Sequence, residues 1–329
     1  MPGSAILGQQ TLLSGVDHLF TSFLSTICGS LLSICVTALA AFAVTLIFRT
    51  STTTNFAQGA IAAFGCYFVA YLLNDKGIPV WLGVFAGMFA GVVVGLVIDV
   101  FIFRNGRRVN AIGKQIITMG IVSLFFGGIP LVFGTPERIP FEAFYNTVKA
   151  KVPPNIVIPL GGGEIVITKH ALICLAITVA VLALLFILLK YSKWGLGVRA
   201  TASNEFTAEL MGVDTHIITA VSWSIAGALG VLAAVMYAGG GTTISASFMT
   251  TIQVNAFLAG ILGGFSTFYG PVVGAVLIPL AASCVGFLAN FKGFSGISRW
   301  QMVIVYVMML VVILIKPEGI FGKRTIKKV

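Results

Sequence analysis

Charged residues are the scarcest class in this sequence. Only 9% of its 329 residues are charged, whereas 58% are hydrophobic, and the mean hydropathy is +1.04. Soluble domains carry roughly 25% charged residues, so this composition excludes an ordinary soluble fold. Apolar stretches of about 20 residues, the length that crosses a bilayer, recur along the whole chain. We therefore expect a single transmembrane domain over residues 1–329, with no separate soluble domain.

The motifs of nucleotide hydrolysis, metal binding and nucleophilic catalysis are also missing. A phosphate-binding loop needs G-x-x-x-x-G-K-[ST], but neither Lys114 nor Lys323 is followed by Ser or Thr. The sequence contains neither H-E-x-x-H nor G-x-S-x-G, and its five cysteines lack metal-ligand spacing. We predict no catalytic residue, no metal site and no cofactor, so any ATP hydrolysis must occur on another polypeptide.

Acidic residues are nearly absent from the apolar segments. Asp99 is the only one inside a predicted span, five residues before Arg104, so an ion pair with Arg104 or Arg108 near the end of that span explains it best. Transporters driven by protons or sodium usually place ionisable groups at mid-membrane. The sequence therefore offers little support for a proton-coupled mechanism.

Nine apolar segments are candidate spans, and all should be helical because a helix satisfies its own backbone hydrogen bonds inside a bilayer. The first is long enough to contain a break near Gly29, and the seventh is short and ends at the turn-forming residues 268–271. The count could therefore be eight or ten. We expect an all-α polytopic bundle of about nine spans, at residues 20–48, 56–73, 79–103, 112–134, 169–189, 216–238, 252–267, 270–290 and 300–316.

The basic residues predict how the bundle is oriented. They lie in short loops rather than along a solvated stripe, so the net charge of +10 does not indicate nucleic-acid binding. If the 190–214 loop is cytoplasmic, the N-terminus is outside, the C-terminus is cytoplasmic, and the Pro- and Gly-rich loop 135–168 is external, either as a plain connector or as a surface for a soluble partner. Thirteen of the 20 basic residues are then cytoplasmic: Arg49, Arg104, Arg107, Arg108, Lys114, Lys190, Lys193, Arg199, Lys316, Lys323, Arg324, Lys327 and Lys328.

A polar segment, "GVRATASNEFTAELMGVD" at residues 197–214, interrupts the apolar sequence. Ser203 or Asn204 is suited to cap the start of a short helix, and Gly212 is suited to end it. An apolar face recurs at Ala202, Phe206, Leu210 and Val213, opposite a face that carries Ser203, Thr207 and Glu209. That face could pack on the protein's own helices or dock into a groove on a cytoplasmic partner.

Four stretches resemble the branched-chain amino-acid permease family of ATP-binding-cassette (ABC) importers and its sugar and nucleoside relatives. The 197–214 segment and the apolar run after it look like that family's coupling loop and next helix. "TTNFAQGAIAAFGCYFVAYLL", from Thr53, resembles its Asn-Phe-Ala-His-Gly segment in the H-type subunit. "VNAFLAGILGGFSTFYGPVVGAVLIPL" resembles its Gly-rich late hairpin, and "KPEGIFGKR" resembles its C-terminal end. The similarity extends from about residue 30 to residue 322.

The resemblance implies a multi-pass permease subunit in the plasma (inner) membrane of a prokaryote. Its partners would be a second permease subunit, identical or homologous, two cytoplasmic ABC ATPases, an external solute-binding protein and the membrane lipid. Gln58 replaces the family's usual His, and residues 1–29 lie outside the similarity. The solute therefore stays open among branched-chain or other amino acids and related amides or urea. The residues implied in ATPase coupling are Arg199, Ser203, Asn204, Glu205, Phe206, Glu209, Leu210 and Gly212.

Uncharged amides beside glycines are candidates for the solute route, because they line a path without a large desolvation penalty. Glycines in addition let helices approach closely or move. The same residues could equally be ordinary packing glycines and interfacial amides. The candidates are Asn55, Gln58 and Gly59 at the second span, and Gln253, Asn255, Gly263 and Gly264 at the seventh.

Two other classes of function remain compatible with the sequence. A secondary transporter or channel for a small uncharged solute would give flux without an ATPase. A membrane scaffold or receptor would give no flux under any condition.

Overall fold

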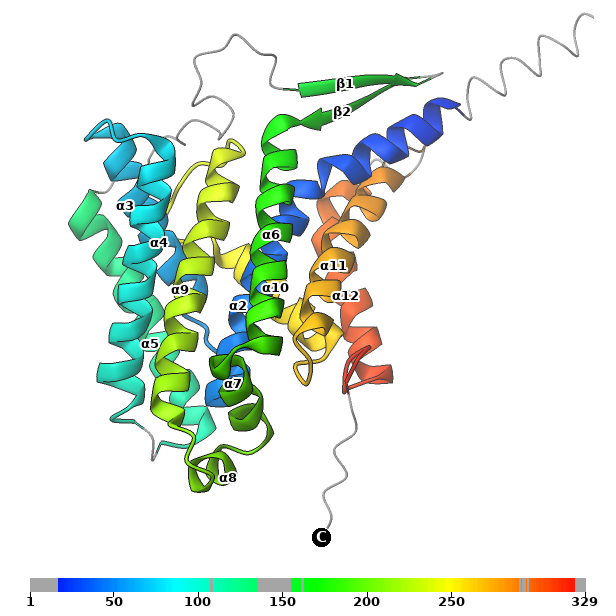
Figure 1. The fold of residues 1–329 in the computed structure, drawn as a ribbon. Helices are drawn as coiled ribbons and strands as arrows, with labels where there is room; N and C mark the ends of the chain where they lie inside the picture. Colours follow the sequence, from blue (N-terminus) through cyan, green and yellow to red (C-terminus); the bar gives the residue numbers. More distant parts are fainter. Residues whose placement is uncertain are drawn as a thin grey trace, which may run out of the picture.

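The computed structural model describes residues 17–106, 109–134, 155–160, 163–289, 291, 294 and 296–322. Within these residues the chain is a bundle of helices with one small pair of strands (Figure 1). Residues 17–29 are helical and lead into the remaining elements. These are α2 (Leu31–Ser51), α3 (Gln58–Asn74), α4 (Val80–Val97), the π-helix η1 (Ile98–Phe103), α5 (Ala111–Phe133), β1 (Asn155–Leu160), β2 (Gly163–Thr168), α6 (Lys169–Tyr191), α7 (Lys193–Ser203), α8 (Glu205–Leu210), α9 (Thr215–Gly239), α10 (Thr250–Gly263), α11 (Tyr269–Leu288) and α12 (Ile297–Ile315).

Seven helical segments of the described chain are long and apolar enough to cross a bilayer. The other two predicted segments are helices as well, but α3 has 17 residues and α10 has 14, against about 20 for a straight crossing. A polytopic helical membrane protein is therefore confirmed, but the count of nine spanning helices is not. The seven are Asp17–Ser51, Val80–Phe103, Ala111–Phe133, Lys169–Tyr191, Thr215–Gly239, Tyr269–Leu288 and Ile297–Ile315.

The orientation of the termini stays a prediction. Some of the basic residues on which it depends lie outside the described residues, namely Arg107, Arg108 and the tail after residue 322. Figure 1 does place α8 and the β1–β2 hairpin at opposite ends of the bundle, as the prediction requires of the 190–214 and 135–168 loops.

The overlong first segment contains the expected interruption. A turn at Ser30, next to Gly29, divides the helical residues 17–51. Both the backbone N–H and the hydroxyl of Ser30 donate to the carbonyl of Ile27, at 3.0 and 2.7 Å. The part before the turn is inclined to α2 in Figure 1, so the first span is two helices in series.

The expectation of a purely helical fold, with an irregular 135–168 loop, is wrong over residues 155–168. Strands β1 and β2 pair antiparallel there, with Asn155 opposite Thr168 and Leu160 opposite Gly163. Ile and Val residues in 155–160 and 163–168 favour an extended backbone over a loop. Residues 135–154, which hold most of the loop's prolines, lie outside the described residues.

Glycines bring α4 and α9 into backbone contact at the centre of the bundle. A Cβ added at Gly227 would lie 2.1 Å from the carbonyl oxygen of Gly91, and one added at Gly95 would lie 2.3 Å from that of Trp223. One helical turn further on, the ring of Trp223 stacks on Phe103 with centroids 4.7 Å apart. Small residues permit this close helix packing inside a membrane, where apolar burial gives helices little reason to associate.

The two short helices begin inside the protein rather than at its ends. An irregular stretch, residues 52–57, precedes α3, and another, residues 240–249, precedes α10. Irregular backbone at membrane depth needs partners within the protein. The hydroxyl of Tyr67 on α3 donates to the carbonyl of Ile244 at 2.9 Å, so α3 stabilises the stretch that leads into α10.

The segment after α12 folds back onto the end of α10. The backbone N–H of Ile320 donates to the carbonyl of Leu262 at 2.7 Å, and that of Phe321 donates to Gly263 at 3.2 Å. Gly264 and Gly319 both have positive φ, 88° and 81°, which only glycine adopts without strain. The late hairpin and the C-terminal stretch noted in the sequence are thus parts of one structure.

Candidate functional site

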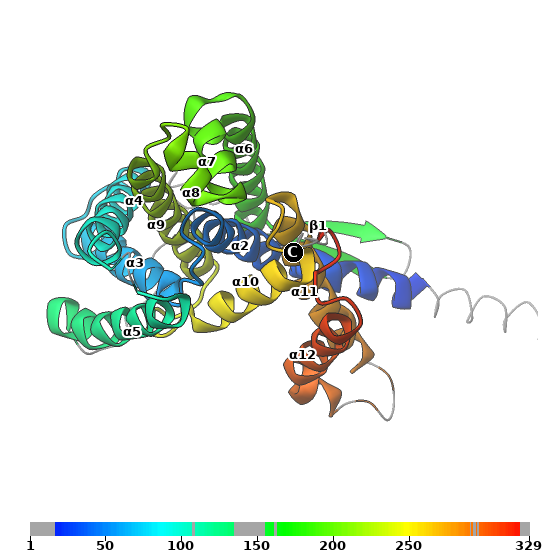
Figure 2. The same cartoon turned by 90° about the horizontal axis from the view of Figure 1, so that it is seen from below.

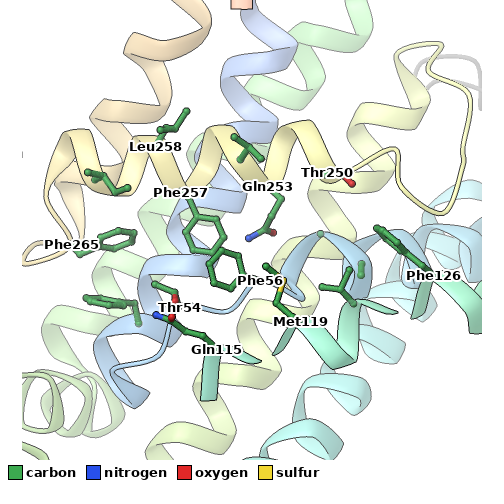
Figure 3. A pocket seen from close by; sticks show the side chains of 16 residues that line it. Thr54, Phe56, Gln115, Met119, Phe126, Thr250, Gln253, Phe257, Leu258 and Phe265 are labelled. Atoms are coloured by element: carbon green, nitrogen blue, oxygen red, sulfur yellow. The ribbon is translucent and has the colours of Figure 1, made fainter. Parts of the chain in front are cut away.

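A large cavity of about 690 Å³ lies between α3, α5 and α10. Figure 3 shows Gln253 and Phe257 extending from α10 toward Phe56, Gln115 and Met119 on the facing segments. The rings of Phe56 and Phe257 are 4.9 Å apart. Polar lining side chains are few and uncharged: Thr54, Gln115, Thr250 and Gln253.

A hydroxyl inside this cavity lacks a protein partner. The Oγ1 atom of Thr54 is buried, and it makes no hydrogen bond within the described part of the chain. A buried hydroxyl without a partner is costly, by about 1–3 kcal/mol, unless water or a ligand satisfies it. Thr54 lines the cavity, and its hydroxyl is the one buried side-chain oxygen among the described lining residues that has no hydrogen-bond partner.

Three of the predicted amides form a network that joins α3, α9 and α10. The side-chain amide of Gln58 donates to the carbonyl of Ala226 at 2.7 Å, and that of Asn55 donates to Oε1 of Gln58 at 3.3 Å. The amide of Gln253 donates to the carbonyl of Asn55 at 3.1 Å. Asn55 and Gln58 are buried and do not line the cavity, whereas Gln253 does.

Asn255 is separated from Gln253 by the body of α10. Two residues along an α-helix correspond to a rotation of about 200°, so the two side chains point in nearly opposite directions. Asn255 lines a different cavity of about 240 Å³, and its Oδ1 accepts a hydrogen bond from the hydroxyl of Tyr306 at 3.2 Å. The seven predicted route residues are therefore not one group in space.

The predicted glycines serve packing. A Cβ at Gly59 would lie 3.1 Å from Cβ of Gln253, so Gly59 lines the large cavity and lets α3 approach α10. A Cβ at Gly263 would lie 2.0 Å from the carbonyl of Gly270, and Gly264 has a positive φ. These last two form the turn between α10 and α11 and do not line the cavity.

Sequence reasoning missed the aromatic lining of the large cavity. Thr250, Gln253, Phe257 and Ile261 follow one another at spacings of three and four along α10, and all of them line it. The spacing was legible in the sequence. However, the same apolar spacing is expected whether that side of a membrane helix contacts lipid, another helix or a cavity. Only the structure shows that this side contacts a cavity.

The polar 197–214 segment forms α7 and α8, which are separated by Asn204. Asn204 has extended backbone angles and caps α8, because its Oδ1 accepts a hydrogen bond from the N–H of Thr207 at 3.0 Å. The single apolar face predicted from Ala202 to Val213 is wrong, because the extended residue puts Ala202 on α7. Ser203 ends α7, and Arg199 of α7 donates to the carbonyl of Lys190 at 3.3 Å.

The end of α8 is also defined by its hydrogen bonds. Gly212 has φ of 83°, and its N–H donates to the carbonyl of Glu209 at 2.9 Å. The next N–H, of Val213, donates to Ala208 at 3.0 Å, which completes a Schellman motif. A carboxylate oxygen of Glu209 accepts from the hydroxyl of Thr215 at 2.5 Å and ties α8 to the start of α9.

The apolar side chains of α8 face away from the protein. Phe206 is 70% exposed and Leu210 is 72% exposed, while Ala208 between them is buried. The neighbouring Met211 is exposed as well. These positions do not pack on the described helices, so the chain presents a small apolar ridge at one end of the bundle.

A charged cleft lies directly behind α8. Glu205 of α8 lines it together with Asp99 of η1, Arg104 directly after η1, Lys114 of α5 and His216 of α9. Asp99 is buried within η1, at the same cleft as Arg104, while Arg108 lies outside the described residues. Glu205 thus brings α8 next to the ends of three membrane helices.

Comparison with known proteins identifies the family. The model of the family described as "Branched-chain amino acid transport system / permease component" matches residues 26–313. The chain belongs to this family. It is thereby a transport permease component and a multi-pass protein of the prokaryotic plasma membrane.

The permease resembles curated relatives over much of their length. It is 26% identical over 288 residues to the probable branched-chain amino acid transport permease protein LivH of Methanocaldococcus jannaschii, covering 86% of this chain and 88% of the relative. It is 24% identical to the high-affinity branched-chain amino acid permease LivH of Escherichia coli K12, covering 69% and 68%. The xylose/arabinose import permease XylH of Sulfolobus acidocaldarius is 25% identical, over 58% of this chain and 48% of the relative.

A solved structure shares the fold. PsaBC from Streptococcus pneumoniae, in complex with a Fab, aligns with a TM-score of 0.51 and 15% identity, covering 88% of this chain and 91% of that chain. At this identity the likeness concerns the arrangement of helices and not the solute.

Proposed function

We propose that this chain is the permease subunit of an ABC importer that moves a small polar solute by alternating access. The solute is a branched-chain or other amino acid, or a related amide or urea. Two such permeases, or this one and a homologue, enclose the route; two cytoplasmic ATPases supply the work, and an external protein delivers the solute. The exposed, capped helix α8 is the observation that carries the proposal beyond family membership.

The ridge on α8 supports docking to a partner. Burying Phe206 and Leu210 in a groove would contribute about 1.5–3 kcal/mol each, and both are already held outward by a helix that is capped at each end. The sequence has no phosphate-binding loop of its own. An ATPase that binds this ridge can shift the permease between its inward-facing and outward-facing conformations only if it binds one conformation more tightly than the other.

The cavity between α3, α5 and α10 supports a solute route. It is larger than a small solute, its lining is uncharged, and Thr54 and Gln253 are among its polar lining residues. Its aromatic and aliphatic walls suit an apolar side chain. Its few uncharged polar side chains can hydrogen-bond to the polar part of a solute that also carries a hydrocarbon group.

The test is a reconstituted importer with Phe206 and Leu210 both changed to Ala. Loss of about 3 kcal/mol or more of docking energy corresponds to at least about a hundredfold weaker ATPase binding, so solute-stimulated ATP turnover and uptake should be lost. Leu131→Ala is the control, because Leu131 is 87% exposed on α5 and lies away from α8. Normal coupling in the double variant, or solute uptake by the permease without any ATPase, would contradict the proposal.

A further inference from the structure

The second cavity, on the Asn255 side of α10, differs from the first in chemistry. In Figure 2, α5 and α12 flank α10 on opposite sides, and the smaller cavity lies on the side of α11 and α12. It has a volume of about 240 Å³. Hydroxyl and amide side chains make up its polar lining, and none of the described residues that line it is charged.

Asn255 supplies the most specific feature of this cavity. Its side chain is 6% exposed, and its Oδ1 accepts a hydrogen bond from Tyr306. Its amide nitrogen, however, makes no hydrogen bond to any described residue. Two N–H donors are therefore held inside the protein, in a fixed orientation, at the wall of the cavity. A donor of this kind, at the wall of a cavity, can bind an acceptor on a ligand or on water.

Hydroxyls from α2, α11 and α10 itself line the same cavity. Ser33 of α2, Thr251 of α10 and Ser283 of α11 all line the cavity, and none of them bonds to another described residue. A hydroxyl both donates and accepts. The lining can therefore satisfy a molecule that carries several neutral donors and acceptors.

Helix irregularities border the cavity. The turn at Ser30 and Pro279 within α11 are both part of its wall. Proline in a helix interior removes one backbone hydrogen bond and leaves a carbonyl without its usual donor. Broken helices of this kind occur at membrane depth where the backbone is buried in protein or lines a polar cavity.

We propose that this cavity is a second binding site, specific for a small uncharged solute rich in hydroxyl or amide groups, such as a polyol or a urea-like amide. A charged ligand would find no counter-charge among the described lining residues, and an apolar one would leave the amide of Asn255 unsatisfied. At about 30 Å³ per water molecule, the space exceeds that of several waters. The site is independent of the proposed transport route, because α10 separates the two cavities.

The test is protection of an engineered thiol in the purified chain, without an ATPase. Ser283→Cys is introduced after Cys28 and Cys284, the two cysteines that are not buried, are changed to Ala. A small neutral thiol reagent should label Cys at 283. Glycerol or urea should slow that labelling in proportion to site occupancy, about threefold at a concentration twice the Kd. Sucrose at equal concentration, too large to enter, should not.

Two controls make the result specific. Asn255→Leu in the same background should abolish protection by glycerol and urea while leaving labelling intact. A thiol placed in the large cavity by Val254→Cys should be labelled but not protected. If Ser283→Cys does not fold, Thr251→Cys is the second probe of the same cavity.

Three outcomes would overturn the inference. They are equal protection by sucrose, no labelling of the cavity thiol at all, and labelling that occurs in detergent but is blocked in lipid vesicles, which would assign the cavity to lipid. Because the measurement uses neither ATPase nor transport, its failure would leave the proposed importer function standing.

Discussion

Helix α8 and the interior around α3 and α10 differ in which kind of side chain they bury. On α8 the apolar Phe206 and Leu210 are exposed, while in the interior the polar Asn55, Gln58 and Gln253 are buried. The interior amides are bonded to one another or to backbone carbonyls. The apolar pair on α8 is mostly uncovered by the described residues. These three interior amides thus find their partners within the chain, whereas the apolar pair on α8 stays exposed.

The comparison distinguishes residues that stabilise the fold from residues that we propose bind a partner. Substitutions in the interior should act on stability, because each removes a bond or a fit that the chain itself supplies. Substitutions on the ridge of α8 should leave stability almost unchanged and act on coupling. The variants below test this division, beginning with the largest expected loss of stability.

Gly227→Ala should be the most destabilising. The added Cβ would lie 2.1 Å from the carbonyl oxygen of Gly91, so two backbones must separate. Overpacking typically lowers the free energy of unfolding by about 1–3 kcal/mol. Because the added Cβ meets backbone rather than a side chain, we expect a loss of about 3 kcal/mol or more. Thermal unfolding in mild detergent measures the loss. Gly120→Ala on α5 is the control, because no atom lies within 4 Å of the added Cβ; equal stability of the two variants would contradict the account.

Gln58→Leu should cost less, by about 1–3 kcal/mol, because it removes the bond to Ala226 and leaves the buried amide of Asn55 without its acceptor. Gln58→His should recover part of this stability, since a ring N–H can donate toward the Ala226 carbonyl. The same unfolding measurement applies. If Leu proves as stable as Gln, the amide network does not hold α3 against α9.

Gly212→Ala should destabilise α8 by about 1–2 kcal/mol, because a residue with a Cβ is strained at a φ of 83°. Hydrogen exchange of the α8 amides should rise, while the global unfolding temperature stays near that of the parent chain. Gly296→Ala, at a glycine with open space and negative φ, is the control. A global loss of stability would show that α8 is part of the core.

The double change of Phe206 and Leu210 to Ala should have the smallest effect on stability. Exposed substitutions away from structural contacts usually change the unfolding free energy by less than about 0.5 kcal/mol. The unfolding temperature of the isolated permease should therefore match that of the parent, even though coupling to an ATPase is lost. A clear drop in this temperature would mean that the two side chains pack on the permease itself.

Much of the architecture could be predicted from the sequence. Apolar length predicted every long helix, because the bilayer imposes one scale on all of them. Asn204 and Gly212 were identified as the ends of a short helix because capping is local: it depends on a side chain and a backbone angle within a few residues. The break beside Gly29 is equally local.

The contacts between helices could not be predicted from the sequence in the same way. Gln253 and Asn255 looked like one polar pair, yet α10 directs them to different cavities. Asn55 and Gln58 looked like lining residues, yet their bonds hold the interior together. Sequence spacing determines the direction in which each side chain points from its own helix. Which neighbouring helix or cavity lies in that direction depends on how the helices pack. Helices α3 and α10 were predicted as spans because composition does not reveal that a helix starts inside the protein.

The contact between residues 320–321 and the end of α10 has a consequence for biosynthesis. The carbonyls of Leu262 and Gly263 acquire these partners only after the ribosome has made almost all of the chain. A nascent permease can insert all its long helices and still have an open α10–α11 turn. A premature stop just after α12 would therefore yield an inserted protein that lacks these two hydrogen bonds at the end of α10.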